Sequence, residues 1–369
     1  MKPLRIVFSE AATSYGGQEQ YIHKLMKGLR DQGHHLEAIC QPHAVLAQKL
    51  AEDGFTVHTL LTDGPKNFVK GVWRLRKVLR QGRFDVVNTN SRRDTMLVGT
   101  AARLAGVPLI VRSRHLAKKV GSLLSYTIVP HAVIACSEYV RNHLLDRGVK
   151  PSQVRVVYPS VPTDQWPQGS TIRDELKLAA NDIVITCVAV MRAQKGHKTL
   201  LQAVEPLIKA QPNIHLVLAG SGAMLDELQQ VVATQGLEKR VHFLGMRADI
   251  PNILNGSDIF ALATDIEATG TVYVEAEAAG LPVVGTRVGG VPEMMVEFET
   301  GLLVPPNDPV AMREALSRLI DNEVLRKTMG SAGRRFVMQG DKFSLQAMVS
   351  NTEQAYRQWL GQRTGGGRS

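Results

Sequence analysis

Residues 259–284 are IFALATDIEATGTVYVEAEAAGLPVV, and this stretch predicts the fold of the chain around it. A short apolar run over 259–262 has the length of a buried strand. A polar loop with a glycine follows, then a helical segment over 272–279, and a second apolar strand begins at 282 after Gly280. A strand, a helix and a second strand in this order form a parallel βαβ unit with a right-handed crossover.

The same alternation extends in both directions from this unit. Further strands are expected at 4–8, 36–40, 56–61, 84–88, 109–112, 132–135, 155–157, 183–190, 215–219 and 241–243. Further helices are expected at 18–32, 97–104, 198–210, 224–235 and 310–321. We therefore predict an α/β protein with two doubly wound, Rossmann-like parallel sheets, which bind ligands at the carboxyl ends of their strands.

The alternation is interrupted once, at 158–170, where three prolines fall within thirteen residues. Such a stretch fits neither a helix nor a central strand, so it is interpreted as the linker between two domains. The predicted parts are an N-terminal domain over residues 1–165, a C-terminal domain over 166–340, a helix over 341–360 that crosses back to the first domain, and a disordered tail over 361–369.

Composition excludes several classes of protein. The 369 residues are 44% hydrophobic and 21% charged, as in ordinary globular proteins rather than disordered or coiled-coil chains. No apolar run approaches the ~20 residues that cross a bilayer. Three scattered cysteines without a CxxC pair argue against a zinc site or a disulfide framework and favour a reducing cytoplasm. Residues 1–165 hold 24 Lys and Arg against 12 Asp and Glu, whereas the remainder holds 20 against 22, which suggests an anionic partner for the N-terminal domain.

Two segments of the N-terminal domain carry candidate site residues after strand ends. Gly16 and Gly17 separate the first strand from the first helix, where glycines let a ligand approach and the helix start offers N–H groups to an anion. A plain tight turn is the alternative. His115 closes the sequence VRSRH at the end of another strand, where a side chain faces the ligand in doubly wound domains. An ordinary half-buried histidine is the alternative there.

The first strand of the C-terminal domain is followed by two basic residues. Arg192 and Lys195 lie three residues apart, and Gly196 then opens a helix. Arg grips a phosphate with a planar fork and Lys adds a point charge, although solvated loop charges explain the pair equally well. The loop is not a Walker A P-loop, and no GxGxxG follows the first strand of the chain. A second glycine-rich loop, 285–293, follows another strand at the same edge of the sheet.

The loop inside the opening stretch carries two carboxylates and a helix start. Gly270, Thr271 and Val272 stand at the N-terminus of the expected helix, with Glu267 before them and Glu275 about one turn in. Carboxylates accept hydrogen bonds from hydroxyls, which suits a ribose or a sugar. For Glu275 the alternative is an acid that interacts with the helix dipole.

Taken in order, these motifs resemble the family 4 retaining glycosyltransferases, and among them the bacterial enzymes of lipopolysaccharide and cell-surface glycans. The resemblance spans about residues 1–340, and its most specific part is the Glu-x7-Glu segment with its flanks. The other matching pieces are Gly16-Gly17, Gly33-His34, Arg114-His115, Arg192-x-x-Lys195-Gly196, Gly280-x-Pro282, Gly289-Gly290-x-Pro-Glu293 and Thr300-Gly301. The resemblance implies the GT-B fold, in which two Rossmann-like domains face a central cleft.

The resemblance also implies a reaction. A nucleotide-diphosphate sugar would bind the C-terminal domain, and a glycan or lipid-linked acceptor would bind the N-terminal one. The acceptor hydroxyl would attack the face that the diphosphate leaves, with no metal ion, because basic side chains and helix dipoles stabilise the leaving group. A UDP-sugar is the favoured donor and a GDP-sugar the other candidate, although nothing in the sequence separates the bases.

Roles for individual residues follow from the same resemblance. Arg192 and Lys195 would hold the diphosphate, Glu275 the ribose and Glu267 the donor sugar. The expected catalytic residues are Glu267, His115, Arg192 and Lys195. The expected nucleotide-sugar site is completed by Gly16, Gly17, Gly270, Thr271, Val272 and Glu275. The sequence departs from the family at Asn88-Thr-Asn90, where His-x-His is common, and at Thr269, where a bulky residue is usual.

Other functions remain open. A nucleotide-sugar epimerase, or a glycosyltransferase with a soluble small-molecule acceptor, would share the fold. A NAD-dependent dehydrogenase is disfavoured because the GxGxxG fingerprint and its acidic partner are missing. Nucleic-acid binding is disfavoured because few aromatic residues accompany the basic ones and no known motif occurs.

An acid-free segment between Asp63 and Asp85 predicts contact with a membrane. Its helical spacing gathers apolar residues on one face and basic residues on another, as in helices that lie on anionic lipid. The apolar set is Phe68, Val72, Leu75 and Leu79, and the basic set is Lys66, Lys70, Arg74 and Lys77, with Trp73 nearby. A core-packed helix with a solvated basic face is the alternative. We expect a cytoplasmic protein that lies peripherally on the inner face of the cytoplasmic membrane.

Overall fold

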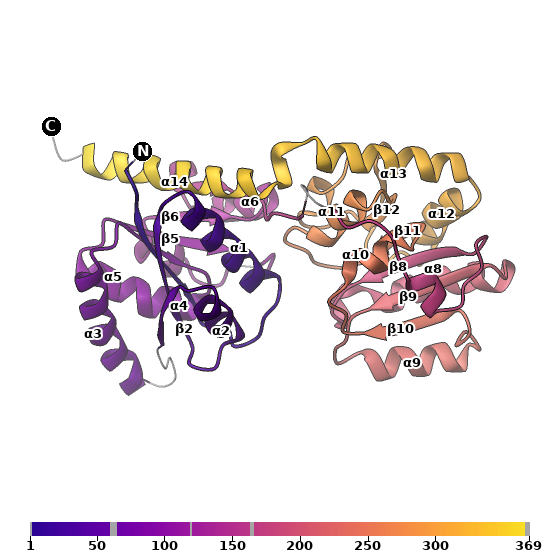
Figure 1. Cartoon of the computed structure of the whole chain (residues 1–369), viewed down its shortest axis with the longest axis horizontal. Coiled ribbons are helices and arrows are strands. Elements are labelled where there is room, and N and C mark those ends of the chain that lie inside the picture. Colours follow the sequence, from indigo (N-terminus) through magenta and orange to yellow (C-terminus); the bar gives the residue numbers. More distant parts are fainter. Residues whose placement is uncertain (1, 60–64, 119, 163–165, 366–369) are drawn as a thin grey trace. The chain divides into compact units, whose positions relative to one another are not determined.

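The computed structural model describes residues 2–59, 65–118, 120–162 and 166–365. The chain divides into two compact units. Unit 1 comprises Met1–Ser160 with Leu345–Ser369, and unit 2 comprises Val161–Ser344. The expected boundaries, at 165 and 340, lie within five residues of these. Each unit is a parallel sheet flanked by helices, as predicted (Figure 1).

Unit 1 contains a seven-stranded parallel sheet in the order β3-β2-β1-β4-β5-β6-β7. Its strands are β1 (Arg5–Glu10), β2 (His35–Cys40), β3 (Thr56–Thr59), β4 (Val86–Thr89), β5 (Leu109–Arg114), β6 (Ala132–Ala135) and β7 (Val154–Val156). The order reverses direction between β1 and β4, which is the switch point where doubly wound sheets bind ligands.

Helices cover both faces of this sheet. They are α1 (Gly17–Asp31), α2 (Val45–Glu52), α3 (Pro65–Gly82), α4 (Arg92–Asp94), α5 (Thr100–Ala105), α6 (Glu138–Asp146) and α14 (Leu345–Gly365), with short turns η1 (Thr95–Gly99), η2 (Leu124–Ile128) and η3 (Pro151–Gln153). Ile6 and Phe8 pack with α1 and α14, whereas Val7 between them packs with α3 and α5. This alternation follows from the period of two in a strand. The expected helix over 97–104 is instead a π-helical turn, η1, that leads into α5.

The C-terminal helix α14 belongs to unit 1. Tyr356 and Trp359 are buried in the same core as α1, and Figure 1 shows the yellow helix lying against that unit. The helix continues to Gly365, so the expectation of disorder from residue 361 is wrong for 361–365. The remaining expected tail, 366–369, lies outside the described residues.

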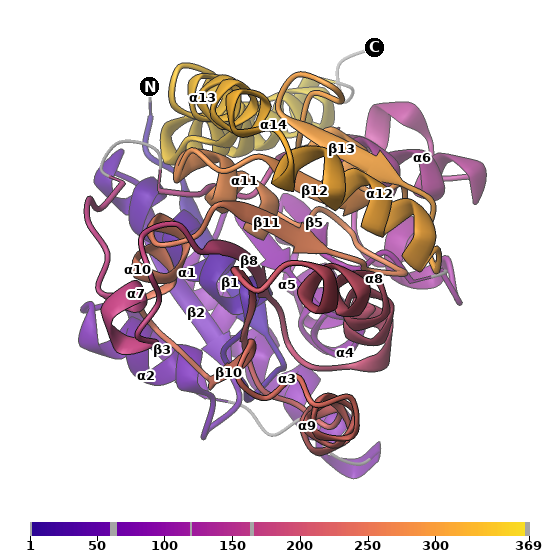
Figure 2. The same ribbon diagram turned by 90° about the vertical axis from the view of Figure 1, so that its right-hand side faces the viewer.

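Unit 2 contains a six-stranded parallel sheet in the order β10-β9-β8-β11-β12-β13. Its strands are β8 (Ile183–Val188), β9 (Ile214–Ala219), β10 (Val241–Gly245), β11 (Ile259–Leu262), β12 (Val283–Thr286) and β13 (Gly301–Val304). Its helices and turns are α7 (Ile172–Glu175), η4 (Ala193–Lys195), α8 (His197–Ala210), α9 (Leu225–Thr234), α10 (Ile250–Asn255), α11 (Thr271–Ala278), η5 (Val291–Glu293), α12 (Pro309–Ile320), α13 (Glu323–Met338) and η6 (Asp341–Phe343). Figure 2 shows α8 and α12 side by side against this sheet, whose switch point lies between β8 and β11.

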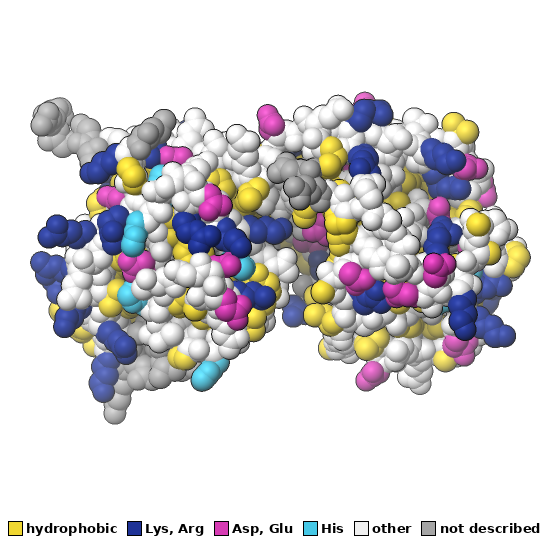
Figure 3. Space-filling view, viewed as in Figure 1, with side chains coloured by type: hydrophobic (Ala, Val, Ile, Leu, Met, Phe, Trp, Pro, Cys, Tyr) yellow, Lys and Arg dark blue, Asp and Glu magenta, His cyan; other side chains and the backbone are white. Residues whose placement is uncertain are grey.

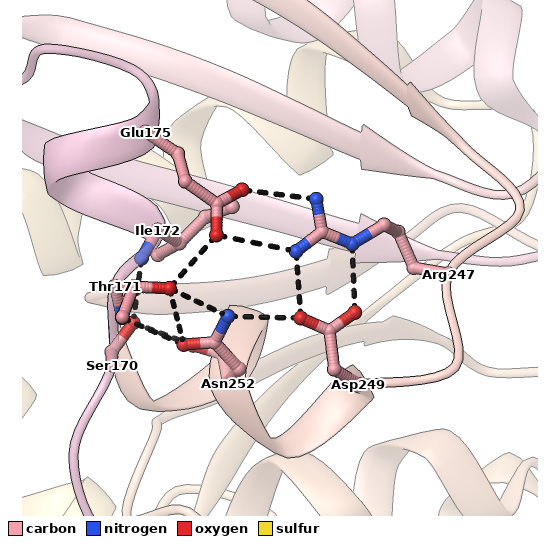
Figure 4. A network of polar contacts seen from close by, with 7 residues as sticks. All are labelled: Ser170, Thr171, Ile172, Glu175, Arg247, Asp249 and Asn252. Atoms are coloured by element: carbon pink, nitrogen blue, oxygen red, sulfur yellow. Dashed lines mark hydrogen bonds and ion pairs between the residues drawn. The ribbon is translucent and has the colours of Figure 1, made fainter.

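The end of the predicted linker is fixed to unit 2. The Trp166 side chain is 5% exposed, and its indole N–H donates to Asn255 of α10 at 2.7 Å. A polar network continues this attachment to α7 and is drawn in Figure 4. In it the Arg247 guanidinium binds the carboxylates of Asp249 and Glu175, and the Thr171 N–H donates to Asn252 at 2.7 Å. The linker between the two units is therefore shorter than the predicted one, 158–170, because its last residues belong to unit 2.

The structure assigns different roles to the two faces of α3. Val72, Leu75 and Leu79 are buried in the core beside the sheet, so the core-packed alternative describes this face. An apolar face enclosed by protein is not available to lipid. The side chains exposed on α3 include Val69 and Trp73, at 58% and 59%, beside the exposed basic residues Lys70, Arg74 and Lys77. The side chain of Lys66 lies outside the described part. Within the described ranges, no helix combines the length and apolar character needed to span a bilayer.

Candidate active site

The loops after β8 and β11 bring two of the predicted site residues of unit 2 together. The Lys195 ammonium donates to the Glu267 carboxylate, Nζ to Oε2, at 2.5 Å across 72 residues of sequence. Both side chains are partly shielded, at 22% and 15% exposure. Arg192 is exposed in the same loop and forms no ion pair within the described residues. The site thus combines a carboxylate-paired cation with a free guanidinium, which can fork onto a phosphate.

Close backbone contacts explain the glycines of these loops. Gly196 has a φ of +65°, and a Cβ there would lie 1.7 Å from the carbonyl oxygen of Ala263. Gly289 has a φ of +55°, and its Cβ would lie 1.8 Å from the carbonyl oxygen of Glu267. The N–H of Gly290 donates to that same oxygen at 3.1 Å. The loop after β12 therefore supports the backbone that presents Glu267.

The helix α11 starts beside Glu267. Its N-cap, Gly270, is left-handed, with a φ of +86°, and lies against the side-chain stem of Glu267. Thr271 and Val272 form the first turn, whose N–H groups and dipole favour an anion. Tyr273 anchors the turn, because its buried hydroxyl donates to the Leu262 carbonyl at 2.7 Å. Glu275 follows one turn into α11, where the sequence placed it.

Unit 1 presents Gly16 and Gly17 at the start of α1. The N–H of Gly16 donates to the buried carboxylate of Glu19 at 2.6 Å, which satisfies one backbone donor at the start of α1. A Cβ on Gly17 would meet no atom within 4 Å, so packing within the chain does not require a glycine there. The open space leaves room for a ligand to approach the backbone.

His115 follows β5 and has a defined environment in unit 1. Its Nε2 lies 3.1 Å from Oδ1 of Asn90, and its ring meets the buried Tyr21 ring edge-on at 4.7 Å between centroids. Burial lowers the pKa of His115 to about 4, and the Arg112 charge contributes in the same direction. The imidazole is therefore neutral near pH 7.

Two buried carboxyls near the switch point of unit 1 were not predicted. Asp94 is 2% exposed and accepts hydrogen bonds from Ser9, Ser91 and the N–H of Asn90. Glu10 is 3% exposed, and burial together with the Asp94 charge raises its pKa to about 7. Their positions at the end of β1 and in the turn after β4 were the available signal. A third, Glu277 of α11, was also missed; it accepts a hydrogen bond from Thr300, and burial raises its pKa to about 8.

The described residues contain no cluster of three or more His, Cys, Asp or Glu side chains arranged to hold a metal ion. In unit 1, Asn90 after β4 and Tyr21 of α1 contact His115.

Two family models match successive parts of the chain. Residues 15–165 match the model described as Glycosyltransferase Family 4. Residues 169–336 match the one described as Glycosyl transferases group 1. The chain belongs to glycosyltransferase family 4. The protein is a glycosyltransferase with the GT-B fold, and the resemblance drawn from the sequence is confirmed.

Individual relatives of this glycosyltransferase act on glycolipids. A "GDP-mannose-dependent monoacylated alpha-(1-6)-phosphatidylinositol monomannoside mannosyltransferase" of Corynebacterium glutamicum is 27% identical over 294 residues, which are 71% of this chain and 74% of that protein. A "UDP-Gal:alpha-D-GlcNAc-diphosphoundecaprenol alpha-1,3-galactosyltransferase" of Escherichia coli is 28% identical over 277 residues, 70% of this chain and 72% of that one. Among solved structures, Anabaena Alr3699/HepE with UDP-glucose has a TM-score of 0.83 at 21% identity and covers 96% of this chain and 100% of its own.

Proposed function

We propose that this glycosyltransferase moves a sugar from a nucleotide-diphosphate sugar to a hydroxyl of a glycan or glycolipid, with retention and without a metal ion. The observation that carries the proposal is the Lys195–Glu267 ion pair at the switch point of the unit 2 sheet. It joins a phosphate-binding cation, a carboxylate that accepts from hydroxyls, and the adjacent start of α11. These are the groups that a sugar diphosphate requires.

The donor is held by residues of unit 2 in this proposal. Arg192 and Lys195 bind the diphosphate, and the first N–H groups of α11 face the same charge. Glu267 binds hydroxyls of the transferred sugar, and Glu275 binds the ribose. Because Lys195 is already paired with Glu267, a bound diphosphate shares the ammonium with that carboxylate. Binding of the phosphate is thereby coupled to the position of the group that binds the sugar.

The reaction breaks the bond between the anomeric carbon and the diphosphate oxygen. The negative charge that develops on the leaving group is stabilised by Arg192, Lys195 and the α11 dipole. The sugar acquires oxocarbenium character, and the acceptor hydroxyl attacks the face that the diphosphate leaves and passes its proton to the departing diphosphate oxygen. A neutral His115 suits this step, because a neutral imidazole places no positive charge beside a cationic sugar.

The nucleotide is proposed to be UDP, with GDP as the second candidate. The two relatives named above take UDP-Gal and GDP-mannose, and the Anabaena structure holds UDP-glucose. A donor screen by thermal shift tests this choice with UDP, GDP and ADP. At one hundred times Kd a ligand adds about 2.7 kcal/mol of stability. We expect UDP to raise the melting temperature of wild type and of Lys198→Ala but not of Lys195→Ala. The absence of stabilisation by every nucleotide would contradict the proposal.

The acceptor is proposed to be lipid-linked, in the synthesis of lipopolysaccharide or another surface polysaccharide. The names of both relatives describe acceptors that contain a lipid and a phosphate. The recovered product separates the alternatives: a free nucleotide sugar with an inverted centre would indicate an epimerase, and transfer to small soluble acceptors alone would indicate a soluble substrate.

A continuous surface of unit 1 supports peripheral attachment at the inner face of the membrane. The Arg76 guanidinium lies over the Trp73 ring at 5.4 Å and donates to the carbonyl of Leu104 at 3.0 Å. Arg103 beside it donates to the carbonyl of Ile128 at 2.7 Å. Trp73, Leu104 and Ile128 are at least half exposed. Figure 3 shows dark-blue basic side chains along the edge of unit 1 where Figure 1 draws α3 and α5.

This surface predicts salt-sensitive binding to anionic vesicles. Each basic residue near such a surface adds about 1 kcal/mol. We expect Trp73→Ala to reduce co-sedimentation with anionic liposomes at low salt, because an exposed indole settles at the lipid interface. Tyr139→Ala is the matched control, since Tyr139 is an exposed aromatic on α6 of the same unit. No binding by the wild type at low salt would favour a soluble acceptor.

A further inference from the structure

A directed chain of hydrogen bonds ends at His115 in unit 1. The side chain of Asn90 lies between the ring of His115 and the backbone of β1. Its Nδ2 is 3.0 Å from the carbonyl oxygen of Ser9, and its Oδ1 is 3.1 Å from Nε2 of His115. Asn90 itself is 4% exposed, so water does not replace these partners freely.

The partners fix the direction of each bond. A carbonyl oxygen only accepts, so the amide of Asn90 donates from Nδ2 to Ser9. The opposite amide orientation would set Oδ1 against the Ser9 oxygen, two acceptors facing each other. Oδ1 therefore faces His115, and the ring must supply the proton from Nε2. In a neutral imidazole this leaves Nδ1 unprotonated.

We propose that Asn90 is a positioning residue that fixes His115 as the Nε2–H tautomer and so leaves Nδ1 as a hydrogen-bond acceptor. The group that meets Nδ1 is then a hydroxyl of the bound sugar or acceptor, a part of the inference that rests on the proposed function. A carbonyl or carboxylate oxygen at that place would find no donor.

The position of Asn90 is itself held from a second side. Its backbone N–H donates to Oδ2 of Asp94 at 2.8 Å, and the Ser9 hydroxyl donates to the same oxygen at 2.7 Å. Ser9 therefore contacts the Asn90 amide through its carbonyl oxygen and Asp94 through its hydroxyl. Asp94 also accepts from the N–H groups of Ser91 and Thr95, at 2.7 and 3.0 Å. These hydrogen bonds hold the turn after β4 in one conformation, so Asn90 has little freedom to rotate away from His115.

An asparagine suits this role better than the histidine common at this position of the family. An amide has one fixed donor end and one fixed acceptor end, and it does not titrate. A histidine could present either a donor or an acceptor to His115 and could take up a proton. The charged and titratable groups around His115 are Arg112 from β5, Tyr21 from α1 and, through Asn90, Asp94 of α4. The Arg112 charge and burial both favour the neutral ring.

Nitrogen NMR of the ligand-free protein with 15N-labelled histidine tests the tautomer directly. His34 and His131 provide internal references, because each accepts a backbone N–H at Nδ1, from Leu4 and Ile110 respectively, both at 3.0 Å. They must also carry the proton on Nε2. The His115 signals are identified by their loss in His115→Gln. At pH 7 we expect a protonated Nε2 and an unprotonated Nδ1; a proton on Nδ1 would overturn the proposal.

The variant Asn90→Leu removes the acceptor and keeps a side chain of similar size. We expect the His115 signals to become an average of both tautomers while those of His34 and His131 stay in place. An unchanged Nε2–H tautomer at His115 would show that Asn90 does not set it. If this variant fails to fold, the wild-type spectrum still decides. Failure of wild type to bind UDP or GDP would overturn the proposed function but leave the tautomer result standing.

Discussion

Removal of the Lys195 ammonium tests how the site stabilises the leaving group. Lys195→Ala deletes the cation that the proposed diphosphate shares with Glu267, 2.5 Å away in a site where both side chains are mostly shielded. Two unit charges about 4 Å apart at an effective dielectric constant near 20 interact by about 4 kcal/mol. At 1.36 kcal/mol for each factor of ten, this corresponds to roughly 10³-fold, within the 10²–10³ measured for single charge-stabilising donors.

The assay is kcat/KM for consumption of the nucleotide sugar identified by the donor screen. Lys198→Ala is the matched control, because Lys198, in the first turn of α8, also pairs with a carboxylate, that of Glu227, but both partners are about half exposed. We expect a fall of roughly 10²–10³-fold for Lys195→Ala and near-normal turnover for the control. Glu267→Gln and the double variant complete a cycle that isolates the coupling between the pair. Normal turnover in Lys195→Ala would refute the assignment of the diphosphate site.

Three further predictions follow from other features of the site. Gly289→Ala should lower stability by about 1–3 kcal/mol and displace the Glu267 loop, with loss of activity. Gly245 is also left-handed but its Cβ would meet no atom, so Gly245→Ala should keep activity. Thermal melts and reaction rates of the two variants test this difference. The buried rings of His115, His131 and His197 have pKa values lowered to about 4, 3 and 4, so each of these rings binds more protons in the unfolded chain below pH 6.5. The raised pKa values of Glu10 and Glu277, about 7 and 8, act in the opposite sense, so the contribution of one ring is measured by difference. His115→Gln should lose less stability than wild type as pH drops from about 6.5 to 4, and identical slopes of melting temperature against pH would contradict this. Activity should survive EDTA; loss that only Mg²⁺ or Mn²⁺ restores would contradict a metal-independent reaction.

The strands could be predicted because each is a short apolar run bounded by turn residues. The expected strands at 132–135 and 259–262 coincide with β6 and β11. The strand β13 was missed because it is four residues long and begins at a glycine, Gly301, which gives little apolar signal. The helix α13 was missed although it has sixteen residues. Its buried positions include Gly330 and Gly333, which pack closely against Gly280 and Glu277 but do not mark an apolar stripe.

The candidate site was predictable as a set of loops but not as a set of contacts. The rule that parallel strands bind ligands at their carboxyl ends located Arg192, Lys195 and Glu267 without a structure. The pairing of Lys195 with Glu267 across 72 residues depends on which strands are neighbours, and the sequence alone does not give the order of the strands. The role of Asn90 was equally hidden, because it depends on the Ser9 carbonyl, a backbone atom of β1.

The stereochemistry of donor cleavage tests the central claim most directly. Proton NMR can follow EDTA-treated enzyme with UDP-glucose, UDP-galactose or GDP-mannose and identify the anomer of the sugar first released to water, before it equilibrates. An α-linked donor should yield the α-anomer in wild type and in Lys198→Ala, and much more slowly in Lys195→Ala. First release of the β-anomer, or an equal rate in Lys195→Ala, would contradict retaining transfer through the Lys195–Glu267 site.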